Sequence, residues 1–174
     1  MELLIKKSVP SDVDKVGALY DKTTKYLSDT VNYPKWTHKV YPSVDYAREM
    51  IKLGVQYQIE DESGVVGTFV LSEDPNGSYQ KVAWGADIAE GEYLVIHALA
   101  VSPERFGCGI GRAAVKYCID KAAKEGYKAV RLDTVPENLP SKRLYENCGF
   151  ICRGEYDLDR HLAFDIFTLY EYLI

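Results

Sequence analysis

The stretch "ERFGCGIGRAA", from Glu104 to Ala114, places three glycines within five positions at the expected start of a helix. Glycine is the least favourable ordinary residue inside a helix, because its backbone loses the most freedom on folding. A strand-like segment, residues 92–101, precedes the glycines, and a helix-like segment continues to Gly126. The first amides of such a helix lack partners and the helix dipole adds positive charge, so the turn predicts a phosphate-binding site. The alternative is a glycine turn that only lets the helix pack closely on the strand.

Two common phosphate motifs fit this turn poorly. A P-loop is excluded, because Gly111 is not followed by the required Lys-Ser/Thr pair. A dinucleotide-binding turn has more support, since Gly107 and Gly109 supply its first glycines and Asp133 lies 22 residues after Gly111, where a ribose-binding acid is expected. Against it, Arg112 occupies the third glycine position and "SPERF" separates the strand from the glycines.

Working outward, local patterns predict eleven elements in the order β-α-α-β-β-β-α-β-α-β-β. They are a strand at 3–7, a helix at 10–27 capped by Ser11, a helix at 43–54 capped by Ser43, strands at 55–59, 65–71 and 92–101, a helix from 110 to Gly126, a strand at 128–134, a short helix at 139–149, and strands at 150–158 and 161–174. The strand at 92–101 is almost continuously apolar, which is typical of a central strand covered on both faces. The buried face of the helix after the glycines is predicted to consist of Ile110, Ala114, Cys118 and Ala122. The order predicts a mixed α/β fold with one parallel β-α-β unit.

Composition narrows the class of protein. The chain has 174 residues, 47% hydrophobic and 27% charged, which fits a single soluble domain over residues 1–174. A net charge of −5 argues against a broad nucleic-acid surface. We expect no secretory signal and no membrane segment, because no apolar run approaches the roughly 18 residues that a spanning helix needs. Four cysteines without a CxxC pair or a metal-ligand spacing predict free thiols in the cytoplasm and no metal site.

A longer segment, residues 97–150, resembles the core of the GNAT superfamily of acetyl-CoA-dependent N-acetyltransferases. The family's phosphate motif, Gln/Arg-x-x-Gly-x-Gly/Ala, is similar to residues 106–111, and its N…LYE…GF pattern is similar to residues 138–150. The segment covers nearly a third of the chain. One position departs from the motif, since Phe106 stands where Gln or Arg is usual, with Arg105 beside it. Whether Arg105 meets a phosphate or faces solvent stays open.

The resemblance implies a fold and a co-substrate. The implied fold is a central mixed, mostly antiparallel sheet of about seven strands, with helices on both faces and a splayed parallel strand pair around the coenzyme A site. The implied co-substrate is acetyl-CoA, without a metal. The residues implied to bind it are Leu99, Ala100, Val101, Phe106, Gly107, Cys108, Gly109, Ile110, Gly111, Arg112, Asn138, Ser141 and Tyr145. Ser141 is equally consistent with a helix N-cap, and Asn138 with a turn residue.

The resemblance also implies catalytic roles. Tyr145 is the expected general acid, because a phenol can protonate a departing thiolate and the family commonly uses the tyrosine at this place. His97 is the expected general base for the acceptor ammonium, with Glu92 or a water chain as alternatives and a histidine bonded within the sheet as the structural interpretation. A backbone N–H near Leu99 would face the thioester oxygen as charge develops.

The acceptor is expected to be a primary amine of a small molecule or peptide, with no nucleic acid or membrane partner. Its pocket is expected to draw on aromatic residues, which supply apolar area with a polar edge but are equally consistent with core packing. The candidates for its walls are Tyr33, Trp36, Tyr41 and Trp84. The apolar C-terminal strand permits a homodimer. A second hypothesis, from another class, is a CoA-binding sensor that kept the phosphate cradle and lost turnover.

Overall fold

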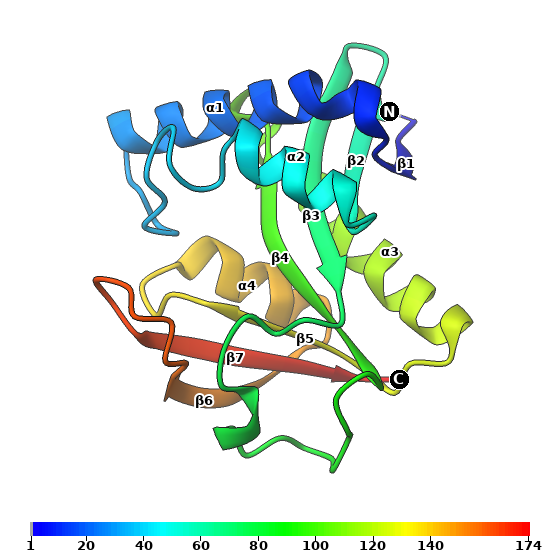
Figure 1. Cartoon of the computed structure of the whole chain (residues 1–174), viewed down its shortest axis with the longest axis vertical. Helices are drawn as coiled ribbons and strands as arrows, with labels where there is room; N and C mark the ends of the chain where they lie inside the picture. The colour runs from blue at the N-terminus through cyan, green and yellow to red at the C-terminus, as the bar shows by residue number, and fades with distance from the viewer. Residues whose placement is uncertain (1) are drawn as a thin grey trace. The chain divides into compact units, whose positions relative to one another are not determined.

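The computed structural model describes residues 2–174, and its elements follow the predicted order (Figure 1). The helices are α1 (Val13–Asp29), α2 (Val44–Lys52), α3 (Ile110–Glu125) and α4 (Leu139–Asn147). The strands are β1 (Leu4–Lys7), β2 (Gln56–Asp61), β3 (Gly64–Ser72), β4 (Tyr93–Val101), β5 (Ala129–Thr134), β6 (Ile151–Asp157) and β7 (Ile166–Leu173). Three short 3₁₀ turns, Pro10–Asp12, Tyr79–Lys81 and Pro103–Arg105, complete the described structure.

All seven strands belong to one sheet in the order β1-β2-β3-β4-β5-β7-β6. The β4–β5 pair is parallel, while the β1–β2, β2–β3, β5–β7 and β6–β7 pairs are antiparallel. The α3 helix connects β4 to β5, as a parallel crossover requires. The predicted fold class, a mixed and mostly antiparallel sheet with a splayed parallel pair, is confirmed.

The chain divides into two compact units that share β4 and α3. The first unit contains residues 1–71 and 98–114, and the second contains residues 72–97 and 115–174. The border therefore falls inside β4, between His97 and Ala98, and inside the first turns of α3. One domain over residues 1–174 stays a prediction.

In the first unit, α1 and α2 pack against each other beside β1, β2 and β3 (Figure 1). Val16 and Tyr20 of α1, Ala47 of α2 and Ala100 of β4 form a buried cluster. The predicted cap of α2 is confirmed, since the Ser43 hydroxyl accepts a hydrogen bond from the Tyr46 N–H at 3.3 Å.

The predicted cap of the first helix is wrong. Asp12, not Ser11, precedes α1, and its carboxylate accepts from the Val9 N–H at 3.0 Å. The chain enters α1 through the Pro10–Asp12 turn, which places Asp12 at the junction between the two helical segments. A proline at the first position of this turn fits that entry, because its missing N–H would lack a partner there anyway.

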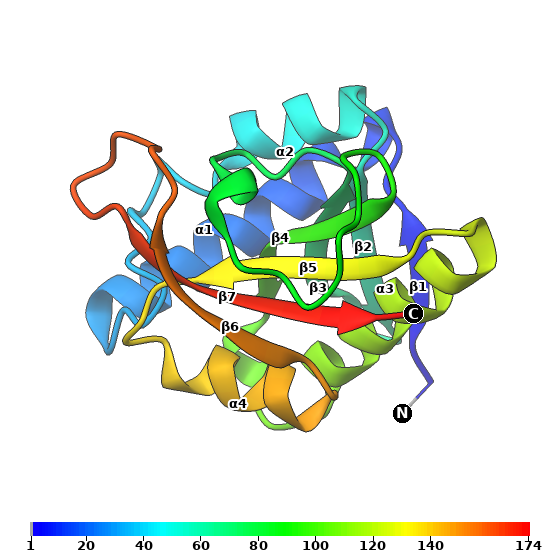
Figure 2. The same ribbon diagram turned by 90° about the horizontal axis from the view of Figure 1, so that it is seen from below.

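In the second unit, β5, β7 and β6 lie side by side (Figure 2). Their buried residues join the β3–β4 loop in one cluster, which includes Tyr79, Tyr93, Val95, Leu158 and Leu169.

The predicted buried residues Ile110, Ala114, Cys118 and Ala122 of α3 are each at most 1% exposed.

The last strand begins later than predicted, at Ile166 rather than at His161. His161 has a φ of 55° and Asp159 has a φ of 53°, and this left-handed backbone cannot continue a strand. The Asp165 side chain accepts from the Leu162 N–H at 3.2 Å and closes the loop before β7. Within the described residues, no helix has the length and apolarity to cross a bilayer.

Candidate functional site

The parallel strand pair separates at the middle of β4. The register of β4 with β5 runs from Tyr93 opposite Ala129 to Ile96 opposite Leu132 and goes no further. Beyond that point β5 pairs with β7 alone, through Thr134. The edge of β4 that faced β5 therefore loses its strand partner at His97, where its main-chain groups become free for another extended chain.

Just after this point, β4 carries an unusual backbone. Ala98 has a φ of 47°, which is rare for a residue with a side chain, and Leu99, Ala100 and Val101 follow it. We refer to this left-handed residue, Ala98, and the change of strand direction that it causes as the bulge. Within the first unit the bulge is held by α1, because the Tyr20 hydroxyl donates to the Ala98 carbonyl at 3.2 Å. Tyr20 is itself fully buried and accepts from the Gln56 side-chain amide at 3.1 Å. The contact of the Tyr20 hydroxyl has no local sequence signal, because its partner lies 78 positions away in the chain.

The glycine turn forms the next part of the chain. The Ser102 N–H donates to the Val66 carbonyl at 2.8 Å, which ties the end of β4 to β3 before the Pro103–Arg105 turn. Gly107 and Gly109 have φ values of 78° and 82°, and a Cβ atom on either would meet nothing within 4 Å. Both glycines thus combine a left-handed backbone with open space.

The start of α3 presents a row of free amides. The first bond of the helix runs from the Ala113 N–H to the Gly109 carbonyl at 3.0 Å. The N–H groups of Gly109, Ile110, Gly111 and Arg112 have no acceptor among the described residues. Their number matches the four unpaired amides that every helix N-terminus leaves.

The charged side chain at the start of α3 is positive, which is the sign that the helix dipole disfavours there. The first turn of α3 contains no acidic residue, and it carries the exposed Arg112. Arg112 forms no ion pair or hydrogen bond with any residue that the structure describes. A cation is unfavourable at a helix N-terminus, where anions are stabilised. An anion from outside the chain would resolve this conflict.

Arg105 and Phe106, which precede the glycine turn, contact other residues of the first unit. Arg105 donates to the Asp61 carboxylate at 2.9 Å and to the Ser63 hydroxyl at 3.3 Å, so Arg105 is held by the β2–β3 turn. Phe106, at the position where the family motif has Gln or Arg, is 48% exposed and meets the Tyr26 ring edge-on at 5.7 Å. Cys108 is exposed and free.

In the second unit, Asn138 caps α4. Its Oδ1 accepts from the Ser141 N–H at 3.3 Å, so the cap is Asn138 and not Ser141. The two N–H groups of the Asn138 side chain have no acceptor within the described residues, although the residue is only 6% exposed. These two donors are available to a ligand.

Tyr145, in the second turn of α4, is 6% exposed and lies among aromatic rings. Its ring centroid is 5.8 Å from that of Phe150 and 6.1 Å from that of Tyr170. Its hydroxyl has no hydrogen-bond partner among the described residues, and it is not fully sealed from solvent. Burial raises the pKa of Tyr145 well above its usual value, so the phenol stays protonated at any ordinary pH.

His97 is bonded within its own unit. Its Nε2 lies 2.7 Å from the Asp74 carbonyl oxygen, and since a carbonyl only accepts, the proton is on Nε2. Nδ1 therefore carries the lone pair. Burial lowers the pKa of His97, with the Asp133 carboxylate opposing that effect in part. The ring is neutral near pH 7, as a base must be.

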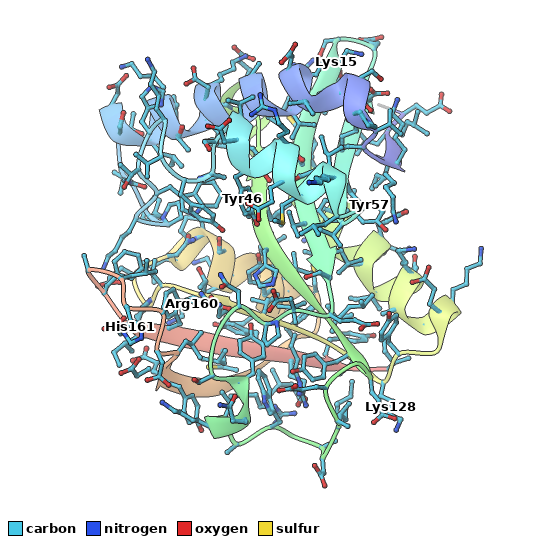
Figure 3. All side chains as sticks on the ribbon, viewed as in Figure 1. Lys15, Tyr46, Tyr57, Lys128, Arg160 and His161 are labelled. Carbon is cyan, nitrogen blue, oxygen red and sulfur yellow. The ribbon has the colours of Figure 1, made fainter. Side chains whose placement is uncertain are left out.

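Two other carboxylates near the strand ends, those of Glu92 and Asp133, are bound by neighbouring residues. Lys128, which is labelled in Figure 3, pairs with Glu92 at the start of β4 and β5 and lowers the pKa of Glu92. Both oxygens of Asp133 are held, by the Arg160 guanidinium and, for one of them, the Tyr79 hydroxyl, all at 2.7 Å. Asp133 is thus unavailable for the ribose contact that a dinucleotide site would need.

The predicted acceptor residues fall into both units. In the first unit, Trp36 packs on the α1–α2 cluster, the Tyr41 ring lies 5.0 Å from the Tyr46 ring of α2, and Tyr33 is 37% exposed. In the second, Trp84 belongs to the β3–β4 loop and donates to the Tyr79 carbonyl at 2.9 Å. No group of three or more His, Cys, Asp or Glu residues that could hold a metal ion occurs in residues 2–174.

Comparisons with known proteins agree with this geometry. The profile of the acetyltransferase (GNAT) family matches residues 20–150. The chain is similar to N-acetyltransferase 8B of Rattus norvegicus, with 31% identity over 97 residues, which are 56% of this chain and 38% of that protein. The chain thus spans well under half the length of this curated relative.

Solved structures share the fold across the whole chain. A GNAT-family acetyltransferase from Streptococcus agalactiae has a TM-score of 0.80 at 17% identity, over 99% of this chain and 95% of that one. YncA of Salmonella typhimurium, solved with its cofactor acetyl-CoA, has a TM-score of 0.68 at 16% identity, over 98% and 93% of the two chains.

Proposed function

The chain belongs to the acetyltransferase (GNAT) family, and from this premise we propose that it moves an acetyl group from acetyl-CoA to a primary amine. The observation that carries the proposal is the start of α3, where four unpaired amides and the unpaired Arg112 adjoin two open, left-handed glycines. Such a site suits a diphosphate, because backbone donors and the helix dipole both favour its charge. The acetyl-CoA held by the Salmonella typhimurium relative supports the same identification.

The acyl end would be bound by the freed part of β4. Main-chain groups of Leu99, Ala100 and Val101 would pair with the pantetheine arm, and Asn138 would add its two free side-chain donors. The Leu99 N–H would stabilise the oxyanion that forms when the amine attacks the thioester carbon.

Proton transfers complete the proposed reaction. His97 would take the proton of the acceptor ammonium at Nδ1, because its Nε2 is engaged by Asp74. The amine would attack the thioester carbon directly, the carbon–sulfur bond would break, and Tyr145 would protonate the departing thiolate. The second proton that the nitrogen loses on becoming an amide would return to the Tyr145 oxygen, directly or through water. The products are an N-acetylated amine and coenzyme A. Trp36 and Tyr33, with Trp84, remain our candidates for the acceptor walls.

The setting of the reaction is also a proposal. None of the four cysteines, all within the described residues 2–174, forms a disulfide, and this supports our proposal of a reducing, cytoplasmic compartment. We propose a small-molecule or peptide amine as the partner, not a nucleic acid, and a homodimer through the C-terminal strands. A thioester-consumption screen with acetyl-CoA over a panel of amines would identify the acceptor.

The proposed diphosphate site at the start of α3 is tested by a matched pair of glycine variants. Gly109 and Gly126 have φ values of 82° and 83°, and a Cβ on either meets nothing within 4 Å, but they lie at opposite ends of α3. Gly109→Asp should weaken coenzyme A binding at least about 100-fold by calorimetry, because it adds negative charge where the diphosphate sits. Gly126→Asp carries the same backbone strain and should leave the affinity within about threefold. Equal affinities in the two variants would remove the phosphate assignment.

A further inference from the structure

Where β4 and β5 separate, side-chain contacts in the second unit take over from main-chain pairing. The last paired residues are Ile96 and Leu132, so His97 and Asp133 are the next residue on each strand. The His97 imidazole donates from Nε2 to the Asp74 carbonyl at 2.7 Å, and Asp74 belongs to the loop between β3 and β4. The position of this candidate base therefore depends on what holds that loop.

Arg160, labelled in Figure 3, lies in the loop between β6 and β7 and binds both the strand end and the β3–β4 loop. Its Nη1 and Nη2 each donate to one oxygen of the Asp133 carboxylate at 2.7 Å. Nη2 also donates to the Pro75 carbonyl at 3.0 Å, and Nε donates to the Asn76 carbonyl. One guanidinium thus joins the end of β5 to the two residues that directly follow Asp74.

This arrangement uses the shape of arginine as well as its charge. A guanidinium is planar and presents its donors in a fixed fork, whereas the ammonium of lysine is a single point of charge. The guanidinium carbon of Arg160 lies 4.6 Å from the centre of the Phe167 ring, which supports one face of the fork. The side chain is only 12% exposed. A lysine at residue 160 would keep the charge but could not bind the carboxylate and both carbonyls together.

The backbone around Arg160 is strained. Asp159 and His161, on either side of it, have φ values of 53° and 55°, which are unfavourable for residues with side chains. The two loops also approach closely, since a Cβ atom on Gly77 would lie 3.0 Å from the Leu158 carbonyl oxygen and 3.1 Å from Nε of Arg160. Strain of this kind persists where the surroundings enforce it, often beside functional groups.

The charged groups that face His97 are Asp133, Arg160 and Asp74. Burial is the largest influence and lowers the pKa of His97. The Asp133 and Asp74 carboxylates raise that pKa, and the Arg160 cation lowers it. Arg160 therefore offsets the carboxylates and favours the neutral imidazole.

We propose that Arg160 is a positioning residue for His97, acting through the Asp74 carbonyl. By holding residues 75–76 against Asp133, it fixes the acceptor that keeps the proton on Nε2 and the lone pair on Nδ1. The inference rests on the proposed function, in which Nδ1 of His97 takes the proton of the acceptor ammonium. Without this hold, the neutral ring would exchange between its two tautomers and would carry its lone pair on Nδ1 for only part of the time.

The tautomer of His97 is the direct readout. Long-range proton–nitrogen correlation spectra distinguish the two ring nitrogens, and the chain has three histidines, so His97 is assigned by its missing signals in His97→Gln. At pH values where the ring is neutral, the unaltered protein should show a protonated Nε2 and an unprotonated Nδ1. In Arg160→Lys the shifts of the two nitrogens should move towards each other, because the ring samples both tautomers.

A second Arg160 variant separates charge from geometry. Arg160→Gln should change the nitrogen shifts in the same way, so it also supplies the test if Arg160→Lys does not fold. It removes the cation as well, so it should raise the pKa of His97, because Asp133 then faces the imidazole without its partner. Arg160→Lys keeps the cation and should raise this pKa less.

Ser78→Ala is the matched control for loop packing. The Ser78 hydroxyl donates to the Asp159 carboxylate at 2.6 Å, so it links the same two loops without binding Asp133 or residues 75–76. Ser78→Ala should lower the melting temperature and leave the His97 nitrogen shifts unaltered. A role of Arg160 in loop packing alone predicts the same spectra for Ser78→Ala and Arg160→Lys.

Catalysis gives an independent readout once the amine screen has supplied an acceptor. Arg160→Lys should lower kcat by about 10- to 100-fold, as expected for a misplaced base, with the KM for acetyl-CoA within about threefold. Ser78→Ala should change neither by more than about threefold.

Three outcomes would overturn the proposal. They are unaltered His97 shifts in both Arg160 variants, the same change of shifts in Ser78→Ala as in Arg160→Lys, and an unaltered kcat in Arg160→Lys when His97→Gln has lost activity. The spectra need neither acetyl-CoA nor an acceptor. If the unaltered protein transfers no acetyl group, the proposed function fails, and the spectra still decide whether Arg160 positions His97.

Discussion

At the scale of single residues, Tyr145 and the adjacent Tyr170 allow the catalytic and packing roles of a buried phenol to be compared. Both phenols lie in one aromatic group, 6.1 Å apart, but Tyr170 donates to Glu146 at 2.8 Å while the Tyr145 hydroxyl has no described partner. Tyr145→Phe should lower kcat by about 10²–10⁴-fold, the usual contribution of a general acid, and leave coenzyme A affinity within about threefold. Steady-state kinetics and calorimetry check this.

Tyr170→Phe is the control for packing. It removes a hydroxyl from the same cluster and should cost stability without lowering kcat. If the unaltered protein and Tyr145→Phe share the same negligible turnover over a broad amine panel, the chain is a coenzyme A sensor rather than an enzyme.

His97 should govern the acidic side of the pH–rate profile. The pKa of His97 in the folded protein lies below 6.5, so its imidazole is mostly neutral at pH 6.5 and above. We therefore expect kcat/KM to fall only at pH values below 6.5. His97→Gln keeps a donor for the Asp74 carbonyl but has no titrating base. In this variant kcat/KM should be lower and the acidic limb should disappear. An unaltered acidic limb would assign the base to another group.

The same residue makes stability depend on pH. Its pKa is lower in the folded than in the unfolded chain, so below about pH 6.5 the unfolded state binds more protons and stability falls as pH falls. In His97→Gln this contribution should vanish. Melting temperatures from pH 5 to pH 7.5 would therefore fall less steeply in the variant than in the parent protein.

At the scale of elements, the bulge in β4 depends on a hydrogen-bond chain from β2 through α1. The Gln56 amide donates to the Tyr20 hydroxyl, which donates to the Ala98 carbonyl. Tyr20→Phe breaks the chain and removes the donor to the Ala98 carbonyl, while the Gln56 amide keeps the Thr68 hydroxyl and the Phe69 carbonyl as acceptors. We expect the unfolding free energy to drop by about 1–3 kcal/mol. Because the bulge precedes Leu99, kcat should fall more than coenzyme A affinity.

Tyr26→Phe is the matched control on the same helix. Tyr26 is 43% exposed and its hydroxyl has no described hydrogen bond, so the same substitution should change stability by less than about 0.5 kcal/mol. Equal denaturation midpoints for the two variants would show that the Tyr20 hydroxyl does not hold the bulge.

Elements with strong local signals could be predicted from the sequence, and their junctions could not. The apolar run of β4 and the spaced apolar residues of α3 indicate their elements directly. The start of α1 was predicted wrongly because Ser11 and Asp12 are both good capping residues, and the turn after Pro10 decided between them. The start of β7 was predicted wrongly because the left-handed His161 lies in an apolar, strand-like stretch.

At the scale of the whole molecule, contacts between distant segments could not be predicted from the sequence. The glycine turn is local, so its place at a helix start could be predicted. The cluster of Arg131, Arg153 and Glu171 joins residues 18 to 40 positions apart, and no periodic pattern marks their pairing. The end of β4–β5 pairing at Ile96 is likewise set by how strands assemble, not by the residues of β4 alone.

Ligand-dependent melting tests the whole folded chain at once. A ligand that binds only the folded state at 100 times its Kd stabilises it by about 2.7 kcal/mol, which is several degrees for a chain of this size. Coenzyme A should raise the Tm in the parent protein and in Gly126→Asp, and not in Gly109→Asp. NADH should raise none of them, because Asp133, the acid that a dinucleotide would require, is already bound by Arg160 and Tyr79. Stabilisation by NADH but not by coenzyme A would mean that the glycine turn holds a dinucleotide and that acetyl transfer is the wrong chemistry.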